Sequence, residues 1–387
     1  MDARAAVVIG AGVGGLTAAN ALHRARWQVT VIERAGALAP IGAGISLAPN
    51  AMNALDAIGL GEAVRAVGEP AAALAAMRPD GHWIFRPAGN PLEHRYGYPL
   101  YLLLRADLLD LLAGALPGGT IRFGAQARAV QPGHDGGPAA VTLPDGTRLE
   151  ADLVVAADGA RSAVRDTLFP GHPGPKYAGF PIWWLLTSAI EQKVVPSETL
   201  GKGVVFGIMP LRDGRVYAYG TVLMPQSRPD GDPLAELRDA TNGWHAQVRM
   251  ILDKVDPARV FRDDSRYLAE PLPAMHLGRV ALVGDAAHPM TPDLGQGGCQ
   301  AIEDGVVLAQ LISGKPVPQA LADYTRVRLP RTTAIVKRSL TVARMHSTTT
   351  PLGLLIRDRA LWLGAKLPPS VAMRSFDFIY NWRPSDS

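Results

Sequence analysis

The chain has 387 residues, of which 48% are hydrophobic and 19% are charged, and its formal net charge is +4. This composition is typical of a folded protein of about two or three domains, and the charge is too small to indicate a nucleic-acid partner. The single cysteine excludes an intrachain disulfide and argues against a cysteine-rich metal site. The sequence shows no export signal and no run of about 18 consecutive apolar residues, which favours a cytoplasmic protein without a membrane span.

The first elements predict a dinucleotide-binding β-α-β unit. An apolar strand at 5–9 is followed by a glycine-rich turn and by a helix expected at 16–25. The glycines permit a tight turn, and the free N–H groups at the start of the helix can bind a pyrophosphate. A second strand at 28–32 leads to a carboxylate at the offset that suits an adenosine ribose, followed by an arginine that can cover the adenosine edge. The candidate cofactor residues here are Gly10, Gly12, Val13, Gly14, Gly15, Glu33 and Arg34.

The following segment completes half of a Rossmann-type unit. A loop at 41–46 precedes a helix that begins near Pro49. An apolar strand at 98–104 is followed by a helix at 106–116 with leucines at helical spacing. The residue between these two elements lies where strand ends normally line a ligand crevice. This segment adds Gly44, Ser46 and Arg105 to the cofactor candidates.

A second crevice segment follows a stretch of hairpins. Residues 120–149 carry hairpin signals, among them the turn Pro144-Asp145-Gly146, and lead into an apolar strand at 153–157. That strand ends at Asp158-Gly159-Ala160-Arg161-Ser162. We therefore expect Asp158 to lie close to the cofactor.

The region after about Gly171 predicts a separate antiparallel sheet. Strand-like stretches lie at 180–188, 204–209 and 215–223, and a turn joins the last two. The two-residue period of the last stretch places Tyr217, Tyr219 and Thr221 on one face.

The chain then returns to the first domain. A strand at 279–284 ends in Gly284-Asp285, whose carboxylate can accept hydrogen bonds from a ribityl hydroxyl. A glycine-rich run leads from there into a helix at 300–313, and its N–H groups and helix dipole suit the negative charge of a reduced flavin. A loop kept only for packing is the alternative. This segment adds Gly284, Asp285, Pro292, Gly295, Gly297 and Gly298, and the three crevice segments together predict non-covalent FAD.

The tail from about 316 predicts helices interrupted by Pro351 and Pro368-Pro369. It carries an apolar stripe that we expect to cover a core, formed by Leu352, Leu355, Leu361 and Trp362. Cys299 is expected to be a helix residue without a redox role.

Three of these motifs, in this order, resemble those of a known family. The turn 10–15, the segment 158–162 with Arg165, and Gly284-Asp285 with Pro292-x-x-Gly295-x-Gly297 are similar to those of single-component FAD-dependent aromatic monooxygenases of the para-hydroxybenzoate hydroxylase type. Residues 292–304 look most like urate hydroxylases, zeaxanthin-epoxidase-like enzymes and natural-product hydroxylases. The resemblance implies that NADPH or NADH reduces FAD, that O2 adds at the flavin C4a carbon, and that the hydroperoxide transfers one oxygen to an aromatic or polycyclic small molecule.

The resemblance also implies an α/β fold, with a Rossmann-type FAD-binding domain, an inserted antiparallel β-sheet substrate domain and C-terminal helices. We expect the FAD-binding domain at 1–70, 98–175 and 271–330, the substrate domain at 71–97 and 176–270, and the C-terminal helical segment at 331–387. Both a monomer and a homodimer stay open.

Individual residues receive roles from the same resemblance. Arg105 matches an arginine at the ribityl–pyrophosphate region of FAD, and Asp158 belongs to a motif that serves both FAD and nicotinamide. Arg161 and Arg165 are candidates for the NAD(P)H phosphates, with pairing to a neighbouring acid as the alternative. His288 is expected to make structural hydrogen bonds in preference to acid–base chemistry.

The substrate pocket is expected between the hairpin of the antiparallel sheet and the glycine-rich loop, facing the flavin. Its candidate residues are Val205, Tyr217, Tyr219 and Asp293, and none is a certain catalyst because the flavin carries the chemistry. Tyr217 looks like the substrate-contacting tyrosine of the urate enzymes, but Val205 stands where their arginine is expected. The pocket therefore favours a neutral polycyclic aromatic over a small anion. Alternatively, the tyrosines only pack and Asp293 caps a turn.

Two other functions stay open on the sequence. One is a flavin-dependent dehydrogenase or reductase of related fold, and the other is a flavin-binding protein without turnover. Because only one dinucleotide fingerprint is present, any NAD(P)H must bind transiently elsewhere.

Overall fold

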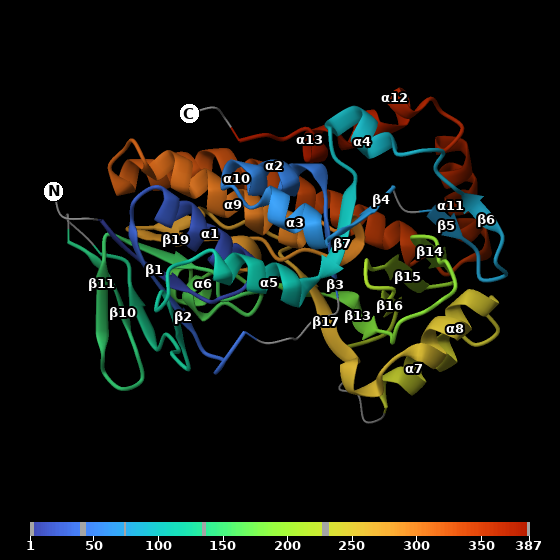
Figure 1. Cartoon of the computed structure of the whole chain (residues 1–387), viewed down its shortest axis with the longest axis horizontal. Coiled ribbons are helices and arrows are strands. Elements are labelled where there is room, and N and C mark those ends of the chain that lie inside the picture. Colours follow the sequence, from blue (N-terminus) through green and yellow to red (C-terminus); the bar gives the residue numbers. More distant parts are fainter. Residues whose placement is uncertain (1–3, 39–43, 73–74, 134–136, 227–231, 385–387) are drawn as a thin grey trace.

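The computed structural model describes residues 4–38, 44–72, 75–133, 137–226 and 232–384. Figure 1 shows two sheet-containing parts side by side. The long helices α9 (Gly297–Ile312) and α10 (Val317–His346) run along the first part, and α7 (Pro233–Ala240) and α8 (Ala246–Lys254) lie on the outer side of the second.

The first part is built on a six-stranded sheet of order β18-β19-β12-β1-β2-β8. Only β18 pairs antiparallel, and the central strands are almost wholly buried because helices such as α1 (Val13–Arg24) cover the sheet. The register aligns Ile9 with Ala156 and Ala156 with Leu282, so the three crevice motifs follow neighbouring strands at one edge. The strands are β1 (Ala5–Ile9), β2 (Gln28–Glu33), β8 (Ile121–Phe123), β12 (Leu153–Ala156), β18 (His276–Leu277) and β19 (Val280–Leu282).

Two small sheets flank this part. The predicted hairpin around Pro144 is confirmed: it joins β10 (Ala139–Thr142) to β11 (Arg148–Ala151), and β9 (Ala129–Gln131) completes that sheet. In the other sheet, β7 (Leu100–Leu104) lies between β3 (Gly44–Leu47) and β4 (Glu69–Ala71). Because β7 ends where α5 (Arg105–Gly114) begins, Arg105 stands at the expected strand–helix junction.

The second part is a seven-stranded sheet of order β17-β13-β16-β15-β14-β5-β6. One face carries Trp183, Phe206 and Ala218 and packs against α7 and α8. The opposite face, with Tyr217 and Tyr219, points toward the first part. The strands are β5 (Ala75–Met77), β6 (Trp83–Phe85), β13 (Lys176–Leu186), β14 (Ser197–Leu200), β15 (Val204–Pro210), β16 (Val216–Val222) and β17 (Phe261–Tyr267).

Shorter helices surround both parts, and the last of them end the described chain. They are α2 (Pro49–Ala57), α3 (Gly61–Val67), α4 (Pro91–Tyr96), α6 (Ala163–Leu168), α11 (Pro351–Gly364), α12 (Pro369–Ala372) and α13 (Asp377–Tyr380). None of the helices in the described ranges is both long and apolar enough to cross a bilayer.

Two sequence expectations were wrong. The helices expected at 16–25 and 300–313 begin three residues earlier, at Val13 and Gly297, because tertiary packing overrides the low helix propensity of the glycines that follow. The tail stripe does not cover a core, since Leu352, Leu355 and Trp362 are exposed.

Candidate functional site

The glycine turn at β1 separates glycines needed for packing from one that faces open space. A Cβ at Gly10, which has φ +102°, would lie 2.5 Å from the Ala157 carbonyl oxygen, and one at Gly15 would lie 2.0 Å from the Gly10 carbonyl oxygen. A Cβ at Gly12 would meet no atom within 4 Å among the described residues. Gly12 precedes the first helical residue, Val13, so the helix N-terminus opens onto a space that a phosphate can enter.

The carboxylate expected at the ribose is held beside this turn. Glu33 accepts hydrogen bonds from the backbone N–H groups of Ala11 (2.8 Å) and Ala35 (2.9 Å). Arg34 follows it and is exposed. These bonds fix the Glu33 carboxylate at the end of β2, next to the N-terminus of α1.

Asp285, Arg105 and the start of α9 face one another. The Asp285 side chain is exposed, yet surrounding protein removes enough hydration to raise its pKa, against the opposing charges of His288 and Arg105. Its Oδ1 would lie 3.8 Å from a Cβ placed at Gly297, in the first turn of α9. A carboxylate, a cation and a helix N-terminus thus converge at the edge where the three motifs meet.

Strand β3 forms a wall between this edge and the second sheet. A Cβ at Gly298 would lie 2.6 Å from Ile45 Cδ1, and one at Gly295, which has φ +61°, would lie 3.0 Å from Ser46 Oγ. On the other side, a Cβ at Gly44 would lie 2.4 Å from the Tyr217 ring. Gly44 and Ser46 therefore stand between the glycine-rich loop and Tyr217, and the rest of the expected loop, 41–43, lies outside the described residues.

A buried charged network that sequence reasoning missed holds α9 in place. Arg328 of α10 donates to Glu303 (2.5 Å) and Asp304 (2.6 Å) of α9, and all three side chains are fully buried. Burial alone would raise the pKa of both carboxyls, but neighbouring cations, Arg328 among them, lower both values. Further partners are Arg331, Asn50 and Gln300. The sequence signal for this network is the acidic pair Glu303-Asp304 within an otherwise apolar helix.

His288 belongs to the same network. Its Nε2 lies 2.6 Å from Asp304 Oδ2, an oxygen that also accepts the Gly284 N–H at 2.8 Å. The ring is 3% exposed, so the structural interpretation fits the geometry. Cys299 is also buried, which raises the pKa of its thiol to about 12.

The polar segment after β12 is held by contacts within the protein. Asp158 accepts hydrogen bonds from the Ser162 hydroxyl (2.5 Å) and the Val164 N–H (3.2 Å), so it caps the start of α6. Arg161 is exposed and pairs with Asp263 at 2.9 Å.

Arg165, the other candidate for the NAD(P)H phosphates, is buried. Its side chain is 2% exposed and donates to the carbonyl oxygens of Ala160 (3.0 Å) and Ala286 (3.4 Å), and it pairs with Asp166. These contacts match the alternative of pairing with a neighbouring acid. The guanidinium also ties the 158–162 motif to the 284–288 motif.

The inward face of the second sheet is aromatic. Cross-strand pairing places Tyr219 opposite Trp184 and Gly207, and Tyr217 opposite Met209. The Trp184 and Tyr217 rings stack with centroids 6.0 Å apart, and Tyr217 and Tyr219 are also 6.0 Å apart. The predicted alternation along β16 is therefore confirmed.

Val205 lies on this face but in a packed position. It is 4% exposed, in an apolar cluster with Ala76, Ile84 and Leu200 that Leu361 and Tyr219 border. Val205 is therefore a packed residue of this apolar cluster, next to Tyr219.

Acidic and basic groups gather at the end of the aromatic face. The Tyr219 hydroxyl donates to Glu198, a residue the sequence pattern did not single out. Asp293 Oδ1 lies 3.5 Å from His346 Nδ1, and Asp293 Oδ2 is buried with no partner in the described part of the chain. Burial lowers the pKa of His346, but Asp293 and Glu198 outweigh it and raise the value. The carboxylate of Asp293 thus contacts His346, and its charge also acts on Tyr219.

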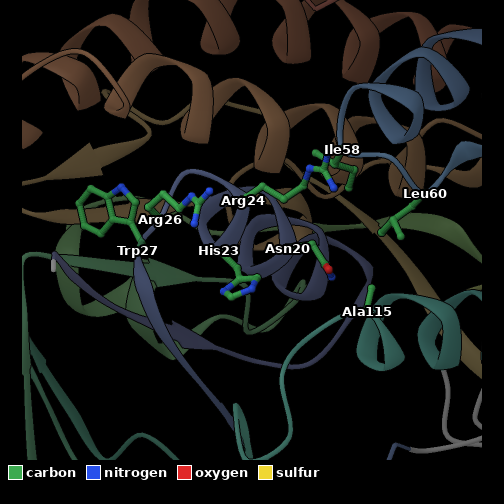
Figure 2. Close-up of a pocket in the computed structure, with 8 residues that line it drawn as sticks. All are labelled: Asn20, His23, Arg24, Arg26, Trp27, Ile58, Leu60 and Ala115. Carbon is green, nitrogen blue, oxygen red and sulfur yellow. The ribbon is translucent and has the colours of Figure 1, made fainter.

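A separate cavity of about 610 Å³ lies at the opposite end of α1, away from all these residues (Figure 2). Basic side chains and a tryptophan border it, but none of the predicted site residues does. Its lining consists of Asn20, His23, Arg24, Arg26, Trp27, Ile58, Leu60 and Ala115. No cluster of His, Cys, Asp and Glu suited to a metal occurs in the described ranges.

Comparisons with known proteins agree with this geometry. A model described as "FAD binding domain" matches residues 3–339. Aurachin C monooxygenase/isomerase of Stigmatella aurantiaca is 35% identical, over 92% of this chain and 93% of its own. FAD-dependent urate hydroxylase of Mycolicibacterium vanbaalenii is 34% identical, over 86% of each chain. The crystal structure of Klebsiella pneumoniae HpxO with FAD and uric acid superposes with a TM-score of 0.90 at 28% identity, covering 98% of this chain and 97% of that one.

Proposed function

The chain belongs to the FAD-binding-domain family of flavoprotein monooxygenases, and we propose that its substrate is a neutral, flat aromatic molecule held against the aromatic face of the second sheet. Enzymes of this family use NAD(P)H and O2. Bound FAD carries electrons from NAD(P)H and, with O2, supplies the oxygen that the substrate receives.

The cofactor-binding residues of the proposal follow from the edge of the first sheet. The space at Gly12 and the N–H groups of α1 suit the pyrophosphate, and Glu33 suits the adenosine ribose. Asp285 and Arg105 suit the ribityl chain, and the N-terminus of α9 suits the negative end of the flavin. We assign residues 1–70, 98–175 and 271–330 to this function and 71–97 and 176–270 to substrate binding.

Substrate is then held mainly by stacking. The Trp184 ring stacks on the buried Tyr217 ring and is itself half-buried, so it can receive a flat ring, and Val205 contributes no charge on the same face. The polar end of the face, where Tyr219 is bonded to Glu198 and Asp293 to His346, suits one O–H or N–H donor of the substrate. A small polyanion would meet two carboxylates there.

The observation that carries the proposal is the position of Gly44. Its backbone touches the Tyr217 ring on one side, while its strand neighbours touch the glycine-rich loop of the cofactor edge on the other. The aromatic face and the cofactor edge are thus separated by one strand, which supports a substrate site beside the cofactor.

The test compares substrates of different charge. We expect NAD(P)H oxidation to be accelerated by a hydroxynaphthalene and to yield a product with one added oxygen atom, labelled when isotopic O2 is supplied. Urate and 3-amino-4-hydroxybenzoate should be poor substrates. Efficient turnover of urate would refute the neutral-substrate proposal, and a product without oxygen from O2 would indicate a dehydrogenase.

A variant tests the aromatic face itself. Tyr217→Phe keeps the ring and should retain FAD, but it removes a hydroxyl near the substrate and should divert more NAD(P)H electrons to H2O2. The ratio of H2O2 formed to NAD(P)H consumed measures this. Unchanged coupling would assign Tyr217 to packing alone.

A further inference from the structure

Helix α11 has its polar and apolar faces reversed. Leu352, Leu355, Ile356 and Leu363 are 66%, 52%, 58% and 57% exposed, whereas the charged residues Arg357 and Asp358 are buried. The exposed residues follow the spacing i, i+3, i+4 and i+11, so they form one stripe along the helix. A surface helix of a soluble protein normally turns such a stripe inward.

The reversed orientation is fixed by specific contacts. The Arg357 guanidinium donates to the carbonyl oxygens of Leu200 and Gly201, both at 2.9 Å. Asp358 accepts from Arg78 at 2.7 Å on the same side of the helix. Arg357 and Asp358 also pair with each other at 2.9 Å, but rolling α11 to bury its leucines would break the bonds to Leu200, Gly201 and Arg78.

The exposed apolar surface continues beyond α11. Trp362, near the end of α11, is exposed, as is Leu367 after the helix, and Figure 1 shows α11 beside β6 at one end of the molecule. Isolated apolar residues on a surface are ordinary, but a stripe of exposed leucine and isoleucine along one helix marks an interaction surface.

The charges on this surface select the partner. Arg359 lies within the stripe, and Lys366 places its Nζ 5.3 Å from the Trp362 ring. The acids of the segment, Asp358 and Asp377, are already paired with arginines. The uncompensated charge among the described residues of this surface is therefore positive.

We propose that the stripe of α11 docks on an anionic phospholipid surface, with its leucines in the acyl boundary and Arg359 and Lys366 at the phosphates. A helix lying in the membrane interface has this pattern of apolar residues, tryptophan and cations. A second copy of the chain fits less well, because a two-fold contact over this stripe would bring Arg359 against its own equivalent.

The test uses the full FAD-loaded chain and vesicles. We expect it to sediment with vesicles of phosphatidylcholine and phosphatidylglycerol and to bind those of phosphatidylcholine alone much less. Ile356→Glu should weaken binding by on the order of tenfold or more, since it replaces an aliphatic side chain that would enter the acyl boundary of the membrane. Arg359→Gln should weaken binding to anionic vesicles about fivefold.

A matched control is Val327→Glu, which places the same charge at an exposed apolar position of α10 and should leave binding unchanged. FAD content and thermal unfolding verify that each variant is folded. If the wild-type chain stays in the supernatant with both vesicles, the proposal fails. It also fails if light scattering shows a dimer that Ile356→Glu dissociates, because the stripe then covers a second copy.

Discussion

Replacing Gly12 by alanine should separate cofactor binding from folding. Gly12 has φ −78° and ψ 179°, which alanine adopts without strain, and the added Cβ meets no atom within 4 Å in the described part of the chain. The free energy of unfolding of the FAD-free protein should therefore hold or rise by up to about 1 kcal/mol, because alanine has fewer unfolded conformations.

The same methyl group would occupy the space that the pyrophosphate enters. Losing one charge-assisted hydrogen bond from a helix N–H costs about 1.5–3 kcal/mol. That corresponds to roughly a tenfold to more than a hundredfold rise in the Kd of FAD. Flavin fluorescence titration measures the Kd, and urea unfolding of the FAD-free protein measures stability.

Two further glycines complete this experiment. Gly15→Ala puts its Cβ 2.0 Å from the Gly10 carbonyl oxygen, so it should destabilise the FAD-free protein by at least about 1–3 kcal/mol. Gly114→Ala adds a methyl in open space at the end of α5 and should change neither quantity much. A wild-type Kd for Gly12→Ala would refute the assignment of this turn to FAD.

Four other substitutions test neighbouring parts of the site. Asp285→Ala should raise the Kd of FAD roughly tenfold to a hundredfold, because a charged acceptor is lost; an unchanged Kd in fluorescence titration removes Asp285 from the cofactor site. Arg161→Ala should raise the apparent KM for NAD(P)H without altering FAD content, whereas Arg165→Ala should lower the melting temperature. If steady-state kinetics give Arg161→Ala a wild-type KM, Arg161 serves only the surface pair with Asp263. Because the pKa of His346 is raised in the folded protein, the charged imidazole stabilises the fold below the unfolded pKa near 6.5. This stabilisation is lost as the pH rises through the folded pKa. The difference in unfolding free energy between wild type and His346→Gln should thus shrink between about pH 5.5 and about pH 8.5. A constant difference would contradict the ion pair with Asp293.

The sequence predicted β1, β2, β12 and β19 of the first sheet because each is a short apolar run bounded by glycine or a polar residue, whereas the short strands β8 and β18 carry no such signal. Ile9, Ala156 and Leu282 end three such runs, and parallel pairing brings the motifs after them together. The period of two along β16 likewise placed Tyr217 and Tyr219 on one face. Local pattern was sufficient where burial of one face decides the structure.

The parts of the structure that the sequence did not predict depend on contacts between residues that are far apart in the chain. Glu198 and His346 belong to the site only because β14 and α10 approach Tyr219 and Asp293 from different sides. The orientation of α11 was mispredicted because Arg357 finds carbonyl partners more than 150 residues earlier, at Leu200 and Gly201. Such pairings leave no periodic signal along the sequence.

The charged network beneath α9 also orders the events of biosynthesis. Arg328 lies 24 residues after Asp304, so in a growing chain that stops before it Glu303 has no arginine partner and Asp304 has only His288 as a basic partner in the described part of the chain. We therefore expect α9 to dock stably against the cofactor edge only once α10 has been synthesised, and FAD to be captured late in synthesis.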